Sequence, residues 1–378
     1  MKHTFSFHFP VITSTASQES SEVLDLSIEA FENGDFLTAM HTLLDSIHPD
    51  LRKRFGNVSG QEFHIPHGAM TIIIRFDKEH LHIKAPLVYL PAQEQIAIMR
   101  QAAAINFQDL DLSRIVLQDN QLNLEYHSPC IHSHPKKIYN VLKEICHIGE
   151  KCDRIFTHEF DAERIIHPRF TPYDFGATDY IYEAIQQSCR ECQEALRLFE
   201  TSRQFNEMWN ILNATFLKLI YVAQPQGELL HLLQNAIRDL GRDLPLAEIV
   251  HKGKTAIREL QEKSKEDIST DLFYAETFIP GKHRSNLQNI REEYNAAFKQ
   301  ITTYMEAGEL KKAGIRMINL FYDIYYQNQV QEDLNLTVGK ALSETSAQPW
   351  SQAAPILYSA LENIMLGKFR KNISHLAA

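Results

Sequence analysis

Residues 70–87 read MTIIIRFDKEHLHIKAPL, and this stretch decides the fold of the first part of the chain. From Met70 to Phe76 apolar residues occupy every second position, which is the period of a strand with one buried face. The polar turn 77–79 interrupts the pattern, and the alternation then resumes as far as Leu87. The stretch therefore predicts two antiparallel strands that share a buried face.

Further elements with helix or strand periodicity flank this hairpin on both sides. They are a helical hairpin over 19–47, a strand over 61–65, a helix over 92–106, a second strand pair over 115–126 and a long helix over 138–156. In the helix over 92–106 we expect Ile96, Met99 and Ala103 to face inward. From Phe36 onward the predicted order is α-β-β-β-α-β-β-α.

The second part of the chain has only the helical period. Residues 161–178 contain two prolines and a glycine without any period, which is typical of a linker. We therefore predict an α+β fold with an antiparallel-sheet domain over 1–160, a linker over 161–178 and an all-helical domain, a bundle or repeat-like, over 179–378.

Composition excludes several classes of protein. The chain has 378 residues, with 38 Lys and Arg against 48 Asp and Glu, a formal net charge of −10. An acidic surface disfavours nucleic acid and anionic membranes, and no window approaches the ~18 apolar residues of a membrane span. Five cysteines indicate free thiols rather than a disulfide framework, and His8 and Pro10 interrupt any signal-peptide-like run. We expect a cytoplasmic protein.

Three inter-helix turns have similar sequences. The stretch Phe31 to Ala39 matches Met305 to Ala313, and residues 199–205 form a poorer copy. This pattern resembles the turn of tetratricopeptide repeats, although the regular period of about 34 residues is missing. A repeat array and ordinary helical hairpins both remain open.

The element order over residues 36–160 resembles the fold of class I type III secretion chaperones and the related YbjN family. Leu90-Pro91, which ends a strand before a helix, and Asn106-Phe107, which follows that helix, carry the same resemblance. It implies a chaperone-like, non-enzymatic domain that forms dimers and binds extended segments of other proteins. The added helical half departs from those small, free-standing chaperones and leaves a role in secretion open.

Two groups of residues are candidates for binding a protein or peptide partner. The first is the outer face of the sheet, where Ile73 stands among Arg75, His82 and Lys84. The second is the aromatic set of the helical half, because tyrosine combines apolar area with a hydroxyl group. Its members are Tyr294, Tyr304, Tyr322, Tyr325 and Tyr326.

Two cysteine-containing stretches have the residue types of metal or redox sites. His127, Cys130, His132 and His134 lie within one loop, and His64 or His67 offers a fourth zinc ligand, although the loop also reads as an ordinary turn. Cys189 and Cys192 have redox-motif spacing, but they continue an apolar helical stripe that predicts core packing.

These observations favour a protein-binding adaptor or chaperone-like protein that forms a homodimer and needs no cofactor. Open sheet edges favour the dimer, because unpaired strands are usually covered. The alternative is an enzyme or metal-binding protein with a site at the domain junction near Arg169, Tyr173 and Asp174.

Overall fold

The computed structural model describes residues 3–12, 20–167, 170–279, 281–284 and 286–368. It divides into two compact units, each assembled from separate stretches of sequence. The α+β unit comprises Ser17–Thr171 and Tyr274–Gly281, and the helical unit comprises Met1–Ala16, Pro172–Phe273 and Lys282–Ala378. The predicted boundaries at 160 and 178 therefore do not describe two stretches of the chain. Residues 1–16 belong to the helical unit, and residues 274–281 belong to the α+β unit.

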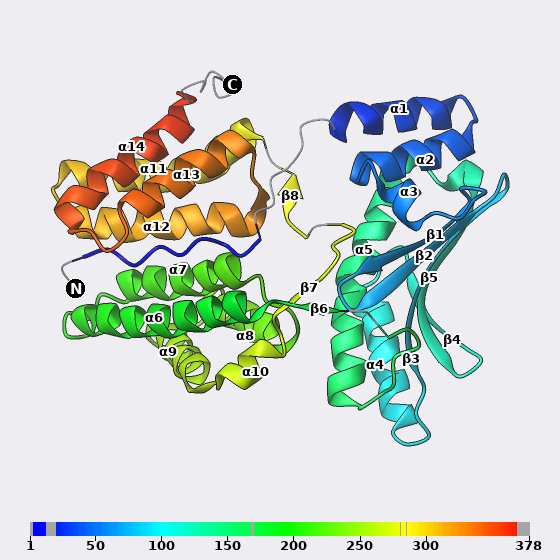
Figure 1. The fold of residues 1–378 in the computed structure, drawn as a ribbon, viewed down its shortest axis with the longest axis horizontal. Helices are drawn as coiled ribbons and strands as arrows, with labels where there is room; N and C mark the ends of the chain where they lie inside the picture. Colours follow the sequence, from blue (N-terminus) through cyan, green and yellow to red (C-terminus); the bar gives the residue numbers. More distant parts are fainter. Residues whose placement is uncertain (1–2, 13–19, 168–169, 280, 285, 369–378) are drawn as a thin grey trace. The chain divides into compact units, whose positions relative to one another are not determined.

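The α+β unit is built on a five-stranded antiparallel sheet, as the alternation predicts (Figure 1). Its strands are β1 (Glu62–His67), β2 (Met70–Phe76), β3 (His80–Tyr89), β4 (Arg114–Gln118) and β5 (Gln121–Pro129), in the order β1-β2-β3-β5-β4. In the first predicted hairpin Ile74 pairs with Ile83, and both are buried. The predicted α+β class and element order are confirmed.

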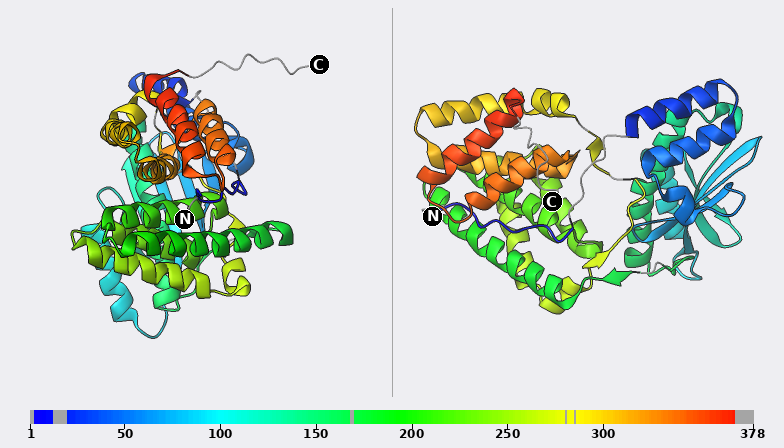
Figure 2. Two further views of the ribbon diagram at one scale, coloured as in Figure 1. Left: turned by 90° about the vertical axis from the view of Figure 1, so that its left-hand side faces the viewer. Right: turned by 45° about the horizontal axis from the view of Figure 1, so that its top comes forward.

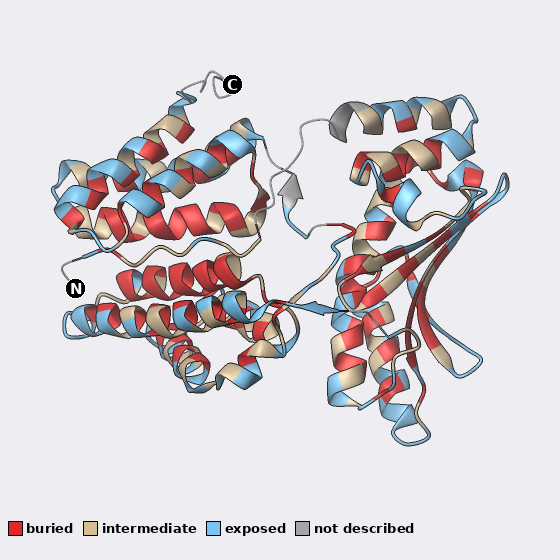
Figure 3. Cartoon of the chain, viewed as in Figure 1, coloured by how far each residue is buried: buried red, intermediate tan, exposed pale blue. Residues whose placement is uncertain are grey.

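Helices accompany this sheet. They are α1 (Ser20–Glu32), α2 (Phe36–Ile47), α3 (Leu51–Phe55), α4 (Gln95–Gln108) and α5 (Pro135–Arg154), with a 3-10 turn η1 (Cys130–His132) and a π-helical turn η2 (Ile155–Glu159). The α1 helix packs on α2 and α5 rather than on the strands, whereas α5 packs against β2, β3 and β5. Figure 3 shows the buried residues along the strands and on the helices that pack against them.

The predicted inward face of α4 is wrong. Ile98, Ala102 and Ile105 point into the core, whereas Ile96 is 70% exposed and Ala103 also faces solvent. The helix carries two apolar stripes, so its periodicity alone does not tell which one is buried. The exposed stripe, hereafter the α4 stripe, consists of Ile96, Met99, Ala103 and Phe107.

The stretch 274–281, hereafter the return segment, completes the core of the α+β unit. Phe278 and Ile279 are buried in the same apolar cluster as the sheet. The Gly68 N–H donates to the Glu276 carbonyl at 2.9 Å, and the Phe278 N–H donates to His67 Nδ1 at 3.1 Å. These contacts bind the segment to the turn between β1 and β2.

The helical unit contains two groups of antiparallel helices, joined where α7 packs against α12 (Figure 2). The helices are α6 (Phe175–Glu200), α7 (Phe205–Ala223), α8 (Gly227–Leu240), α9 (Leu246–Glu262), α10 (Lys265–Ser269), α11 (Leu287–Glu306), α12 (Leu310–Gln327), α13 (Glu332–Glu344) and α14 (Trp350–Leu366). Two-residue strands also occur, β6 (Thr171–Pro172) with β7 (Phe273–Tyr274) and β8 (His283–Arg284) with β9 (Asn328–Gln329). The part of the chain that the structure describes has no helix with the length and apolarity of a membrane span.

The three turns with similar sequences share one backbone geometry. Gly34, Gly308 and Arg203 all have positive φ, at 78°, 71° and 51°. In each turn the next residue donates its N–H to a carbonyl five residues earlier, as from Asp35 to Ala30. This is the pattern that closes a helix before an abrupt change of direction. The third copy is shifted by one residue relative to the sequence match.

Candidate functional site

The sheet brings the predicted surface residues together on its outer face. Ile73 pairs with Lys84, and Arg75 pairs with His82 on neighbouring strands. Arg75 contacts Glu62 at 2.8 Å, and the distance from Lys84 Nζ to Glu125 Oε1 is 3.3 Å. The three polar residues of this set therefore surround the half-buried Ile73 on one surface.

Three histidine rings stack on the same face. The register of β3 and β5 sets His82 opposite His127, with ring centroids 4.0 Å apart, and His80 lies 5.3 Å from His127. Burial lowers the pKa of His82, and the charges of His127 and His80 lower it further. Protonation of His82 would add positive charge to the face that already carries Arg75 and Lys84. The sequence placed His127 in a loop, because strand pairing cannot be read from one strand alone.

The structure does not assemble the four residues of the predicted metal loop. His127 joins the outer face, whereas Cys130 is buried and its thiol donates to the Asp77 carbonyl at 3.5 Å. His134 accepts the Lys136 N–H at the start of α5, and His132 lies in η1. Over the described ranges no group of three or more His, Cys, Asp and Glu side chains has a geometry that could hold a metal ion.

The predicted aromatic residues lie mostly inside the helical unit. Tyr294, Tyr322 and Tyr325 are buried, and the Tyr294 hydroxyl donates to Asp323 Oδ2 at 2.9 Å. Tyr304 and Tyr326 are only partly buried and pack against the core. Those two rings are the members of the set that keep solvent-exposed area.

Two other candidates have structural roles in the helical unit. Cys189 and Cys192 are buried on α6, and burial raises the pKa of each thiol to about 12, so both are neutral at physiological pH. At the predicted junction site, Asp174 accepts the Ala177 N–H and begins α6, and the Tyr173 hydroxyl donates to the Gln224 carbonyl. Arg169 lies outside the described residues.

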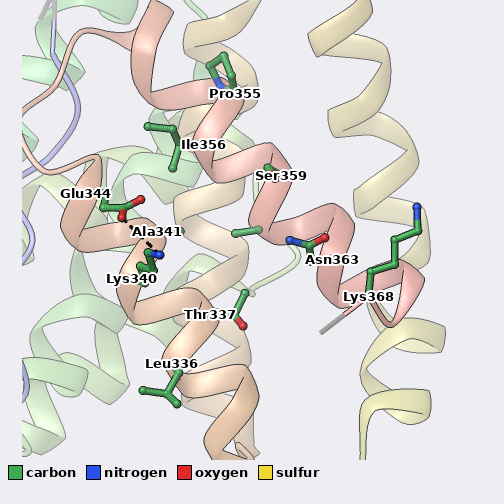
Figure 4. Close-up of a pocket in the computed structure, with 11 residues that line it drawn as sticks. Leu336, Thr337, Lys340, Ala341, Glu344, Pro355, Ile356, Ser359, Asn363 and Lys368 are labelled. Atoms are coloured by element: carbon green, nitrogen blue, oxygen red, sulfur yellow. Dashed lines mark ion pairs between the residues drawn. The ribbon is translucent and has the colours of Figure 1, made fainter. Parts of the chain in front are cut away.

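An open groove runs between α13 and α14 of the helical unit (Figure 4). Leu336 and Ile356 provide exposed apolar area. On α13, Lys340 Nζ lies 3.8 Å from Glu344 Oε1. The lining of this groove therefore mixes apolar and charged groups, as protein-binding surfaces do.

Comparison with known proteins neither supports nor opposes the resemblance to the secretion chaperones and the YbjN family. No protein-family model matches the sequence, and no curated protein is detectably similar to it.

Proposed function

We propose that this chain is a non-enzymatic, chaperone-like adaptor that binds a polypeptide partner through the outer sheet face and the helical grooves. The observation that carries the proposal is that each unit already holds a remote segment of the chain outside its main helices and strands. The α+β unit holds the return segment, and the helical unit holds residues 3–12. A surface that satisfies the main-chain groups of one such segment has the chemistry to satisfy another. A cytoplasmic location belongs to the same proposal, because all five cysteines are unpaired.

The outer face is tested by reversing its charge. Affinity capture from native cells, quantified by mass spectrometry, compares the wild-type chain with an Arg75→Glu/Lys84→Glu double variant. We expect the wild-type chain to retain a specific polypeptide. Its retention by the double variant should fall at least about tenfold, roughly 1.4 kcal/mol, because the substitutions remove two cations and the new carboxylates repel acidic groups of the partner.

A matched control makes the same charge change elsewhere. Lys299→Glu/Arg242→Glu reverses two exposed cations of the helical unit that lie outside the α13–α14 groove and should retain the polypeptide normally. Equal retention by the wild-type chain and the sheet-face variant would contradict binding through this face.

We further propose a homodimer that uses the α4 stripe. Phe107 is 89% exposed, and α4 packs beside the edge strand β4, whose Val116 and Leu117 are also exposed. Exposed apolar area of this kind commonly marks an interface. Light scattering at micromolar concentration should give a dimer mass for the wild-type chain and a monomer mass for Phe107→Glu. Ile131→Glu, at another exposed apolar position, should stay dimeric, and a monomeric wild-type chain would refute the proposal.

A further inference from the structure

Residues 3–12, hereafter the N-terminal segment, lie in a groove of the helical unit. Figures 1 and 2 show this segment running between the helix group that contains α6 and α7 and the group that contains α12 and α14. Its hydrogen-bond partners come from α6, α7 and the connection between α13 and α14. All of these elements belong to one compact unit, and they lie far from the segment in sequence.

The groove binds the main chain of the segment on both sides. Side chains of the helical unit accept its N–H groups and donate to its carbonyls, and these main-chain contacts do not depend on which residues the segment contains. The Ser6 N–H donates to Glu191 Oε2 at 2.9 Å, the Phe7 N–H donates to Ser346 Oγ at 2.9 Å, and the Phe9 carbonyl accepts from the Tyr180 hydroxyl at 3.0 Å. Main-chain recognition of this kind is how protein grooves hold extended peptides.

Ser6 lies at the centre of these contacts. Its hydroxyl donates to Glu191 Oε1 and accepts from Gln187 Nε2 at 2.7 Å, while its carbonyl accepts from Lys218 Nζ at 2.6 Å. Lys218 is only 4% exposed, and burial lowers the pKa of its ammonium to about 8. A buried ammonium group requires acceptors, and a peptide carbonyl at this position provides one.

The side chains of the segment alternate between two environments. The Thr4 hydroxyl, like that of Ser6, both donates and accepts a hydrogen bond. It donates to the Thr345 carbonyl and accepts from the Gln348 N–H. Between them Phe5 meets the edge of Trp350, with ring centroids 6.2 Å apart. Residues 4–7 therefore present hydroxyl, aromatic, hydroxyl and aromatic groups in turn.

The segment is anchored less firmly than a core helix. Phe9 is 64% exposed, and Phe5 and Phe7 are only partly buried. Since apolar burial supplies most of the docking free energy, a segment with exposed rings dissociates more readily than the helices beneath it.

We propose that this groove is a peptide-recognition site, that the N-terminal segment is its exchangeable internal occupant, and that its external ligand is an extended partner segment with Ser or Thr alternating with Phe. The inference rests on the proposed function and names the class of segment that the helical unit binds.

The experiment uses the full chain and a fluorescein-labelled peptide with the sequence of residues 3–12, followed by fluorescence anisotropy. Ser6→Glu places a second carboxylate beside Glu191 and repels the internal segment from the groove. We expect the probe to bind this variant at least about tenfold more tightly than it binds the wild-type chain, in which the internal segment competes. Ser6→Thr keeps the hydroxyl and should bind the probe as weakly as the wild-type chain.

Several outcomes would overturn the proposal. One is a Ser6→Glu chain that keeps its helical circular dichroism and binds the probe no better than the wild-type chain. Unfolding of the helical unit by Ser6→Glu would make the segment an indispensable part of the core. A wild-type dimer that the probe dissociates would assign the groove to a second copy. Probe binding does not involve the outer sheet face, so this result and the capture experiment can fail independently.

Discussion

Replacing Ile279 with alanine is expected to lower the free energy of unfolding of the α+β unit by about 2–5 kcal/mol. Ile279 is 3% exposed and lies in the core cluster of the sheet, although 274–281 follows more than 100 residues of the helical unit. Its substitution removes buried methyl groups and leaves a cavity that the packed strands cannot fill.

Two probes separate the units in this experiment. Both tryptophans of the chain, Trp209 and Trp350, lie in the helical unit, so their fluorescence follows that unit. Amide hydrogen exchange of β2 and β3 follows the α+β unit. The substitution should accelerate exchange in the strands and leave the tryptophan transition in place.

The matched control is Ile131→Ala, since Ile131 is 66% exposed in the same unit. Its cost should stay below about 0.5 kcal/mol. If Ile279→Ala lowers stability only in the tryptophan transition, the return segment stabilises the helical unit instead. That result would contradict its assignment to the α+β unit.

Acidification should release the same segment through His67. Burial lowers the pKa of His67 from 6.5 to about 4, so the unfolded chain takes up a proton at a pH where the folded chain does not. The stability contributed by the neutral ring is fully present above pH 6.5 and is lost as the pH falls towards 4. The loss should amount to about 3 kcal/mol.

The structure gives this loss a location. His67 Nδ1 accepts the Phe278 N–H, and a proton on that nitrogen would remove the acceptor. The other ring nitrogen, Nε2, lies 3.3 Å from Glu150 Oε1 and remains available as a donor. Protonation therefore weakens the contact with the return segment first.

His67→Asn is the suitable comparison, because its side-chain oxygen can accept the same N–H without titrating. Urea denaturation at pH 7 and pH 4.5, followed by exchange of the β1 and β2 amides, measures both chains. Acidic groups that do not contact the ring contribute equally to each chain and cancel in the difference, so the difference reports His67 together with its neighbour Glu150. Equal losses in the two chains would show that His67 does not carry the pH dependence.

The sheet was predictable from the sequence because its signal is local. Alternation fixes which residues of β2 and β3 face inward, and it thereby placed Ile73, Arg75, His82 and Lys84 on one surface. The stacking of the histidines could not be predicted in full from the sequence. The contact between His82 and His127 depends on the register of two strands that α4 and β4 separate in the sequence.

The errors have non-local causes. The helix α4 has apolar residues on two sides, so the choice of the buried side depends on what packs against it. The partners of 3–12 and 274–281 are remote in sequence, and nothing in either stretch tells which unit it docks into. Tyrosine composition likewise does not tell a core ring, such as Tyr322, from a partly exposed ring, such as Tyr304.

The discontinuous units also set an order of events during synthesis. Residues 172–273 belong to the helical unit, so the α+β unit has all but its last strip of core when residue 171 is made and lacks Phe278 and Ile279 until residue 281. At roughly 5–20 residues per second, the intervening 110 residues (281 − 171) take about 5–20 seconds. The N-terminal segment waits longer, because its partner Gln348 is made later than residue 281. During translation the α+β unit therefore waits for its internal occupant, whereas the N-terminal segment waits for its groove.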